Sequence, residues 1–354
     1  MSIGDTLVVD AVAHAVDNSP EARSRNRFAA SVIDGNFAWQ EMLIPAEYVL
    51  EKEHYFRKCS AELLISAMFL ESQVDVACFH AIPMWGIFQD FSPITIGLEI
   101  RRRYPHRMFI YGPISPFEGV GRSIDRLEQL VSEHHIDGIK MYPFDFIDGK
   151  MRSFSLTDEK LLYPILQRCV ELGVKVVAVH KAVPLGIAPI DPYRMGDVDY
   201  AAVDFPQLNF EIVHGGLAFL DETALQIARY PNVYVNMEVT AQYACKFPEK
   251  FARIMGEFLL SGGERKLIFS TGCSFTHPRP VIEAFNDFKM PQNMVDGGYP
   301  ELTDQAKRNI FGLNWARMHG IDLAALKAKI DGDDIEAQKR RRGLRPAWVA
   351  ARAA

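Results

Sequence analysis

The sequence has few cysteines, no long apolar run and no excess of basic residues. Its five cysteines lie far apart without a Cys-x-x-Cys pair, which argues against a disulfide framework or a cysteine zinc site and fits a reducing cytoplasm. No segment approaches the roughly 18–20 uninterrupted apolar residues of a membrane-spanning helix. The 45 acidic residues outnumber the 39 basic ones, which argues against nucleic acid as the main partner. We therefore expect a cytoplasmic protein that binds a small molecule and neither nucleic acid nor a membrane.

The patterns of a signal peptide and of a nucleotide-binding motif are also missing. The first ten residues have neither a basic n-region nor an apolar h-region, so we expect no signal peptide there. No GxGxxG motif or P-loop follows the first apolar run, which weakens the alternative of a doubly wound nucleotide-binding sheet.

Short apolar runs rich in β-branched residues recur along the chain, with amphipathic segments between them. Near-continuous apolar runs are typical of parallel strands that are buried on both faces. Eight such runs predict strands at 6–12, 74–82, 108–112, 138–142, 174–180, 209–214, 233–239 and 266–271. Strand and helix alternating eight times predict a (β/α)8 TIM barrel of the α/β class.

Two of the intervening segments carry clear helical periodicity. Apolar residues recur at helical spacing in 122–135 and again in 157–173. In the second segment Thr157 resembles an N-cap and Gly173 a C-terminal stop, which predicts a helix between them.

Two regions interrupt the alternation of strand and helix. Residues 15–73 are far more than one helix requires, and we expect an insertion that folds over the barrel mouth as a lid. The barrel should occupy 1–323, followed by a polar, basic tail at 324–354 that is helical or disordered. The basic run at 339–342 is interpreted as a solvated helix face, with an anionic partner or an oligomer contact as the alternative.

Polar residues end most of the predicted strands, where TIM barrels carry their chemistry. Four of the ten histidines lie there, at His14, His80, His180 and His214. Neutral imidazole is a ligand for zinc, iron or manganese and a general base near neutral pH. His14, His180 and His214 together with a carboxylate would therefore form the ligand set of a catalytic divalent metal.

Several segments, in this order and spacing, resemble one known family over about residues 6–323. They are VVDAVAH (8–14), RRRYPHRMFIYGPISP (101–116), DGIKMYP (137–143), VKVVAVHKAVP (174–184), DPYRMGDVDYAAVDFPQLNFEIVHGG (191–216), NVYVNM (232–237), KLIFSTGCSF (266–275) and AKRNIFGLNWARMHGI (306–321). Together they resemble the amidohydrolase-2 branch of the metal-dependent hydrolases, which includes aminocarboxymuconate semialdehyde decarboxylase and γ-resorcylate decarboxylase.

The resemblance assigns roles and also shows two departures. It implies metal ligands at His14 and His180, and an acid/base group or second metal ligand at His214. The family's first-strand ligand pair is His-x-His or Glu/Asp-x-His, but here Val12 takes the first position. The family's strand-8 aspartate falls on Gly272, so two of the usual ligands are missing.

Three explanations follow from these departures. The site is rebuilt with Glu238, or with Asp10 or Cys273; or it is metal-free and uses acid/base side chains; or the barrel binds a ligand without catalysis. We favour Glu238 because it ends strand 7, next to both His214 and the vacated strand-8 position, although it could instead form a salt bridge with Lys140 or Lys181.

Further residues receive provisional roles. We assign catalysis to His214, Glu238 and Lys140, with carbamylation of Lys140 as a minor alternative, and Cys273 as a nucleophile or a buried core thiol. Substrate contacts are assigned to His80, Lys181, Tyr142 and Trp85. The aromatic residues form either a lid or the core of the insertion; they are Phe37, Trp39, Trp85, Phe88 and Phe91.

The leading functional hypothesis is an enzyme, a metal-dependent hydrolase that acts on a small cyclic or aromatic molecule. A metal would activate water, and His214 would transfer protons. Zinc is the leading candidate, with iron or manganese, or no metal, as alternatives. The alternative functions are a non-oxidative decarboxylase and a non-catalytic ligand-binding barrel.

Because barrels of this branch usually associate, we predict a homodimer or higher oligomer. Light scattering at micromolar protein concentration should give a mass of at least twice the 40.0 kDa of the chain. A monomer mass under those conditions would contradict the prediction.

Overall fold

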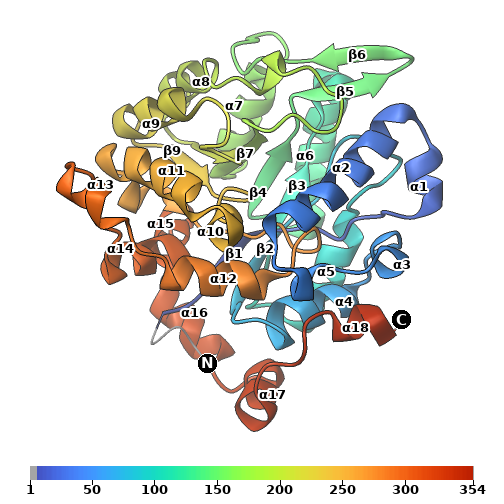
Figure 1. Cartoon of the computed structure of the whole chain (residues 1–354). Helices are drawn as coiled ribbons and strands as arrows, with labels where there is room; N and C mark the ends of the chain where they lie inside the picture. The colour runs from blue at the N-terminus through green and yellow to red at the C-terminus, as the bar shows by residue number, and fades with distance from the viewer. Residues whose placement is uncertain (1–5, 354) are drawn as a thin grey trace.

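The computed structural model describes residues 6–353, and eight parallel strands form its centre (Figure 1). They pair in the order β1-β2-β3-β4-β7-β8-β9-β10. Their bounds are β1 Val9–Ala13, β2 Val76–His80, β3 Met108–Pro113, β4 Gly138–Met141, β7 Val176–His180, β8 Asn209–Val213, β9 Val233–Asn236 and β10 Leu267–Ile268. The eight strands lie within or close to the eight predicted runs, and the TIM barrel prediction is confirmed.

The strands are mostly apolar because both of their faces are buried. Every residue of β1, β2, β4 and β7 is buried, as expected for parallel strands between a barrel interior and a shell of helices. A two-stranded antiparallel hairpin, β5 Phe144–Ile147 and β6 Lys150–Ser153, was not predicted. Its second strand is fully exposed, so it carried no apolar signal.

The barrel closes between β1 and β10 through few backbone contacts. The Ala11 N–H donates to the Phe269 carbonyl at 3.1 Å, and a bridge pairs Ala13 with Cys273. Asp10 adds a side-chain link, since its carboxylate accepts the Thr271 N–H at 2.9 Å and the Thr271 hydroxyl. This buried carboxyl therefore joins the first strand to the last.

Helices cover the outside of the barrel and its mouth (Figure 1). They are α1 Pro20–Ser24, α2 Arg27–Leu43, α3 Lys52–Tyr55, α4 Ala61–Ile65, α5 Ile94–Arg103, α6 Val120–His134, α7 Tyr163–Glu171, α8 Val198–Asp204, α9 Leu220–Arg229, α10 Tyr243–Lys246, α11 Pro248–Leu260, α12 Pro278–Asp287, α13 Gln292–Asp296, α14 Asp304–Arg308, α15 Asn314–His319, α16 Leu323–Ile330, α17 Asp334–Arg342 and α18 Val349–Ala353. Among the described residues, no helix is both long and apolar enough to cross a membrane.

The helix predicted from Thr157 begins later than expected. Helix α7 starts at Tyr163, with Pro164 in its first turn, and residues 158–162 form turns. Proline lacks an N–H and clashes with the preceding turn, so it is accommodated at the start of a helix and not in its interior. Thr157 is therefore not the N-cap, whereas Gly173, with φ +75°, does follow the helix as its stop.

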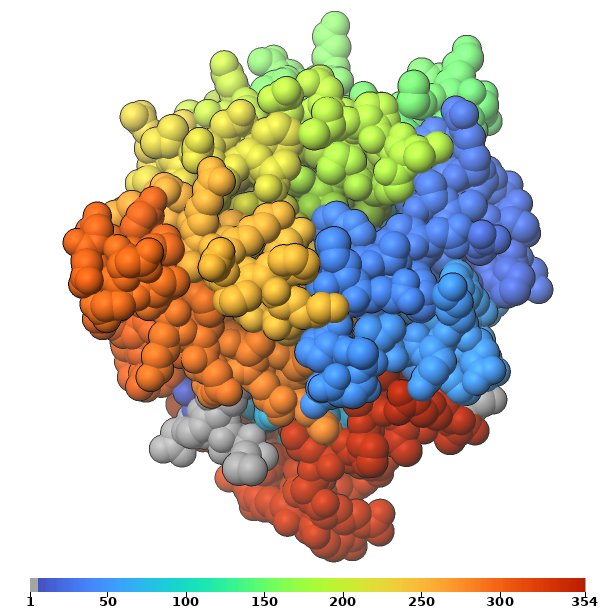
Figure 2. Space-filling model, viewed as in Figure 1, coloured from blue at the N-terminus to red at the C-terminus, as the bar shows by residue number. Residues whose placement is uncertain are grey.

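The long segment after β1 contains α1 to α4, and α2 lies across the mouth of the barrel. The Ser31 hydroxyl accepts the Ile187 N–H at 3.2 Å, and the Lys246 ammonium donates to the Glu41 carbonyl at 3.0 Å. Helix α2 therefore contacts the segments that follow β7 and β9, and Figure 2 shows this blue segment against yellow-green and gold ones. The segment has the position of a lid.

The C-terminal tail is helical and partly buried. Trp348 is 1% exposed; its backbone N–H donates to the Glu71 carboxylate at 2.6 Å and its indole N–H to the Tyr48 carbonyl at 2.7 Å. Lys339, in the basic run, donates to the Val74 carbonyl at 2.9 Å. The tail thus packs on the barrel and on the end of the insertion.

Asp10 predicts a pH dependence of stability. Burial raises its pKa from 3.8 to about 7, against the opposing effect of its hydrogen bonds. The folded state binds the proton of the Asp10 carboxyl more tightly than the unfolded state does. The stability that this protonation contributes is therefore complete below pH 3.8 and is lost as the pH rises through 7. Asp10→Asn mimics the protonated carboxyl, so its free energy of unfolding should rise relative to wild type by a few kcal/mol between pH 4 and 8 (about 1.36 kcal/mol per pKa unit). Chemical denaturation at several pH values measures this, and parallel curves for the two proteins would contradict it.

Candidate active site

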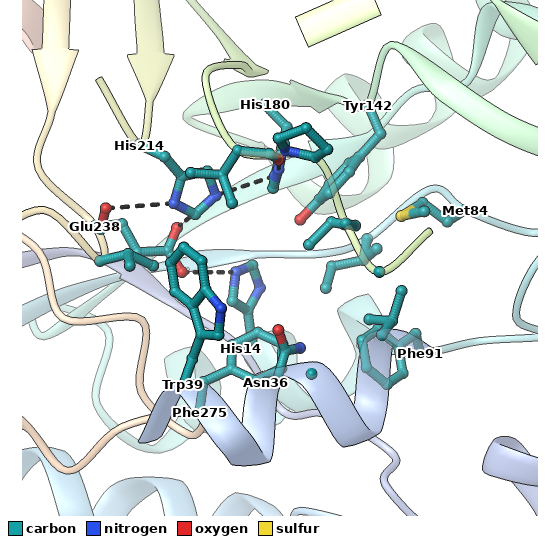
Figure 3. A pocket seen from close by; sticks show the side chains of 18 of the residues that line it. His14, Asn36, Trp39, Met84, Phe91, Tyr142, His180, His214, Glu238 and Phe275 are labelled. Carbon is teal, nitrogen blue, oxygen red and sulfur yellow. Dashed lines mark hydrogen bonds and ion pairs between the residues drawn. The ribbon is translucent and has the colours of Figure 1, made fainter. Parts of the chain in front are cut away.

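A cavity of about 400 Å³ lies between the carboxyl ends of the strands and helix α2. This volume is within the usual range of sites for small molecules. In Figure 3 the side chains of His14, His180, His214 and Glu238 gather at one end, and Met84 and Phe91 lie at the other. The cavity therefore has a polar end and an apolar end.

Each of three imidazoles is held by a backbone carbonyl. His14 Nδ1 lies 2.7 Å from the His80 oxygen, His180 Nε2 lies 2.7 Å from the Val183 oxygen, and His214 Nδ1 lies 3.3 Å from the Glu238 oxygen. A carbonyl can only accept, so each of these ring nitrogens carries the proton. A neutral ring has one such proton, and the other nitrogen of each ring therefore has a free lone pair.

The three free lone pairs and one carboxylate converge. His14 Nε2 is 3.8 Å from one oxygen of Glu238, and His214 Nε2 is 3.6 Å from the other. His214 Nε2 is also 3.1 Å from His180 Nδ1. Two imidazole nitrogens without protons repel each other at this distance, so the arrangement favours a cation or a proton between them.

Burial sets the protonation of these groups. It lowers the pKa of His14 to about 3 and the pKa values of His180 and His214 well below 6.5, with positive charge on Lys140 acting in the same direction. Burial raises the pKa of Glu238 to about 8, and Lys140 opposes that rise. The imidazoles are therefore neutral, which is the form that binds metal.

The donor set fits a divalent metal in its chemistry. Three neutral imidazoles held by outer carbonyls, plus one carboxylate, are the ligand types of zinc, iron and manganese sites. As the side chains lie, no group of three or more His, Cys, Asp or Glu residues within 6–353 is already arranged to hold an ion. Binding would therefore draw the four donors together.

Glu238 fills the space that Gly272 leaves empty. A Cβ at Gly272 would lie 2.5 Å from Oε1 of Glu238 and 3.1 Å from its Cδ. A side chain at position 272 and the observed Glu238 side chain thus compete for one volume. The carboxylate from β9 occupies the place to which a strand-8 aspartate would point.

Lys140 lies beneath the site and does not line the cavity. Its ammonium is buried without a hydrogen-bond partner in the described part of the chain. Burial lowers its pKa to about 8, while Glu238 and Glu211 oppose that fall. Within residues 6–353 Glu238 makes no direct ion pair with Lys140 or Lys181, although the charge of Lys140 lowers the pKa of Glu238; Lys181 is paired with Asp197.

Four residues were predicted to contact substrate, and the structure places them in different surroundings. Tyr142 lines the cavity and stacks on His180, with ring centroids 4.6 Å apart. His80 is buried beneath, stacked on a tyrosine ring 4.3 Å away. Lys181 points to Asp197, 2.7 Å from one carboxylate oxygen, and Trp85 lies under the Arg126 guanidinium. Of these four, Tyr142 alone faces the cavity.

The other candidate residues, which are the aromatic ones, Cys273 and Asp10, lie partly in the cavity and partly in the core. Trp39 and Phe91 line the cavity, whereas Phe37 and Phe88 pack in the core around it. Cys273 is fully buried and burial raises its thiol pKa well above 9, so the core-thiol interpretation holds. Asp10 points to Thr271 and is no metal ligand in this arrangement.

Sequence reasoning missed several residues that line the cavity. They come from helix α2, from the segment after β7 and from the segment after β10: Ser31, Val32, Asn36, Gln40, Val183, Leu185, Ile187, Phe275 and Thr276. None belongs to a strand end with a titratable group, which was the signal used. The spacing of 32, 36 and 39, about one helical turn apart, is the pattern that could have identified the inner face of α2.

Gly272 provides a test of the competition with Glu238. Gly272→Ala should lower the free energy of unfolding more than Gly262→Ala, because both glycines have left-handed φ (+72° and +75°) but nothing lies within 4 Å of a Cβ at Gly262. The conformational cost common to both is about 1–2 kcal/mol. In a Glu238→Ala background the two alanine substitutions should cost the same, as measured by chemical denaturation in a double-mutant cycle. An unchanged difference in that background would show that Glu238 is not the group displaced.

Several solved structures have a similar fold. An uncharacterised TIM-barrel protein from Bordetella bronchiseptica superposes with a TM-score of 0.62 at 16% identity, covering 90% of this chain and 99% of its own. A 2,6-dihydroxybenzoate decarboxylase from Rhizobium gives 0.55 at 13%, covering 89% and 99%. A 5-carboxyvanillate decarboxylase from Novosphingobium aromaticivorans, solved with manganese and a nitrobenzoic acid, gives 0.55 at 14%, covering 90% and 97%. These likenesses show the fold.

The sequence itself matches a family. No curated protein matches the chain in a sequence search. The family model described as Amidohydrolase matches residues 96–321, which is more than half of the chain. The match does not include residues 6–95, to which the resemblance also extended. The chain belongs to the amidohydrolase family and is an enzyme.

Proposed function

We propose that the protein is a metal-dependent hydrolase that acts on a small cyclic or aromatic molecule. The observation that carries this proposal is the convergence of three imidazole lone pairs and the Glu238 carboxylate at the polar end of the cavity. His14, His180, His214 and Glu238 would hold the metal, and zinc, iron and manganese all suit this donor set. When bound, a divalent metal polarises a substrate oxygen or lowers the pKa of bound water.

The protein's own residues orient the site and handle protons. The carbonyls of His80 and Val183 keep the rings of His14 and His180 in one orientation, with their lone pairs directed inward. As the alternative to binding the metal, His214 Nε2, between His180 and Glu238, is the atom that could accept a proton and return it to the product. Helix α2 covers the cavity and limits its contact with water.

A non-oxidative decarboxylase is the second candidate, and the enclosure of the cavity between the strand ends and helix α2 favours it. Moving a carboxylate out of water raises its free energy relative to neutral carbon dioxide, so burial of the substrate promotes its loss. Two of the similar solved structures are decarboxylases of substituted benzoates, and one of them was solved with manganese. In that reaction a protonated group must deliver a proton to carbon.

Metal content tests the proposal. Glu238→Gln should bind zinc or manganese at least about a hundredfold more weakly, because even partners outside the ligand set typically contribute about 10–100-fold. His14→Ala and His180→Ala should likewise lose metal and activity. Elemental analysis and calorimetric titration measure the loss, and circular dichroism checks that each variant is folded.

Glu211→Gln is the matched control, since Glu211 is an equally buried carboxylate whose partners are Asn236 and Tyr111. It should keep its metal. Full occupancy in Glu238→Gln, or equal loss in both variants, would contradict the assignment of Glu238.

A further inference from the structure

The cavity contains no cationic side chain. Its ionisable lining groups in the described chain are His14, His180, His214, Glu238 and Tyr142; no lysine, arginine or aspartate lines it. The two lysines at the strand ends do not reach the cavity, since Lys140 is buried beneath the His–Glu cluster and Lys181 is paired with Asp197. An anion far from the polar end would therefore be desolvated without a counter-charge, which is costly.

The far end of the cavity is apolar. Met84 and Phe91 lie there, on the side away from Glu238, as Figure 3 shows, and the apolar residues Val32, Ile82 and Leu185 also line the cavity. Aromatic side chains at both ends, including Phe275 near His14, suit a flat ring.

Neutral hydrogen-bonding groups face the same space. Asn36, Trp39 and Tyr142 line the cavity and make no side-chain hydrogen bond with the described chain. Gln40 and Gln242, by contrast, are bound to the carbonyls of Phe275 and Thr271. These three groups can pair with hydroxyl, ether or carbonyl substituents and offer no charge.

We infer that this cavity selects substrates with a single charged group. The reacting head lies at the His–Glu cluster, a flat apolar body extends toward Met84 and Phe91, and further substituents are neutral. A second carboxylate or a phosphate on the body is excluded. The inference rests on the proposed function in one respect, that the head is held at the His–Glu cluster.

Binding of four probes to the manganese-loaded protein tests this selectivity. Benzoate, monomethyl isophthalate and isophthalate share a charged head, and their second substituent is absent, a neutral ester or a carboxylate. Methyl benzoate lacks the charged head and serves as the control for recognition of the head. Calorimetry should show at least tenfold weaker binding for isophthalate than for benzoate and monomethyl isophthalate.

A lysine in the lid should reverse the preference. Asn36→Lys places a cation in the cavity and should bring isophthalate to at least the affinity of benzoate. Ala38→Lys adds the same charge to the same helix at an exposed position, and its preference should remain that of wild type.

The outcomes separate the inference from the proposed function. Equal binding of isophthalate and monomethyl isophthalate in wild type, or no binding of any probe, overturns the inference. The same gain for Ala38→Lys as for Asn36→Lys overturns it too, because the effect is then one of net charge. If methyl benzoate binds as tightly as benzoate, recognition of the charged head fails, while isophthalate and monomethyl isophthalate still test the exclusion of the second charge.

Discussion

The site depends on three hydrogen bonds from imidazole N–H groups to backbone carbonyls. Each bond fixes a ring and its tautomer. The carbonyl of His80 belongs to the last residue of β2, and those of Val183 and Glu238 lie in the segments that follow β7 and β9. Because the outer nitrogen of each ring donates its proton to a carbonyl, the inner nitrogen has a lone pair that is directed toward the same point. The barrel supplies this arrangement because its eight strand ends lie on one rim.

Gly272 and Glu238 show that neighbouring strand ends on a barrel rim can share one volume. The side chain of Glu238, which follows β9, reaches the space beside Gly272, which follows β10. Glutamate has one more methylene than aspartate, and a glycine opposite it makes the room. If Glu238 is the metal ligand that we propose, the rim has a carboxylate at the site although position 272 carries none. The valine at position 12 has no comparable replacement and packs inside the barrel.

The fold and the polar half of the site could be predicted from the sequence, and the apolar half could not. Buried parallel strands have a simple signature, and a histidine at the end of one marks the rim; His14, His180 and His214 followed from that. The substrate contacts predicted for Lys181 and Trp85 are not seen, because a position near a strand end does not tell where a long side chain points. Both side chains contact residues outside the cavity. Asn36 and the loop at 183–187 reach the site through packing between distant segments, which no local pattern records. Pro164, whose effect is local, was predictable and was overlooked.

The docking of Trp348 has a consequence for how the protein is made. This residue binds Glu71 and the Tyr48 carbonyl, which precede it by 277 and 300 positions. The early strands can begin to pair while synthesis proceeds, at about 5–20 residues per second. The contacts that support the end of the segment after β1, however, cannot form until Trp348 has been synthesised. Until then the buried position that the indole fills is open.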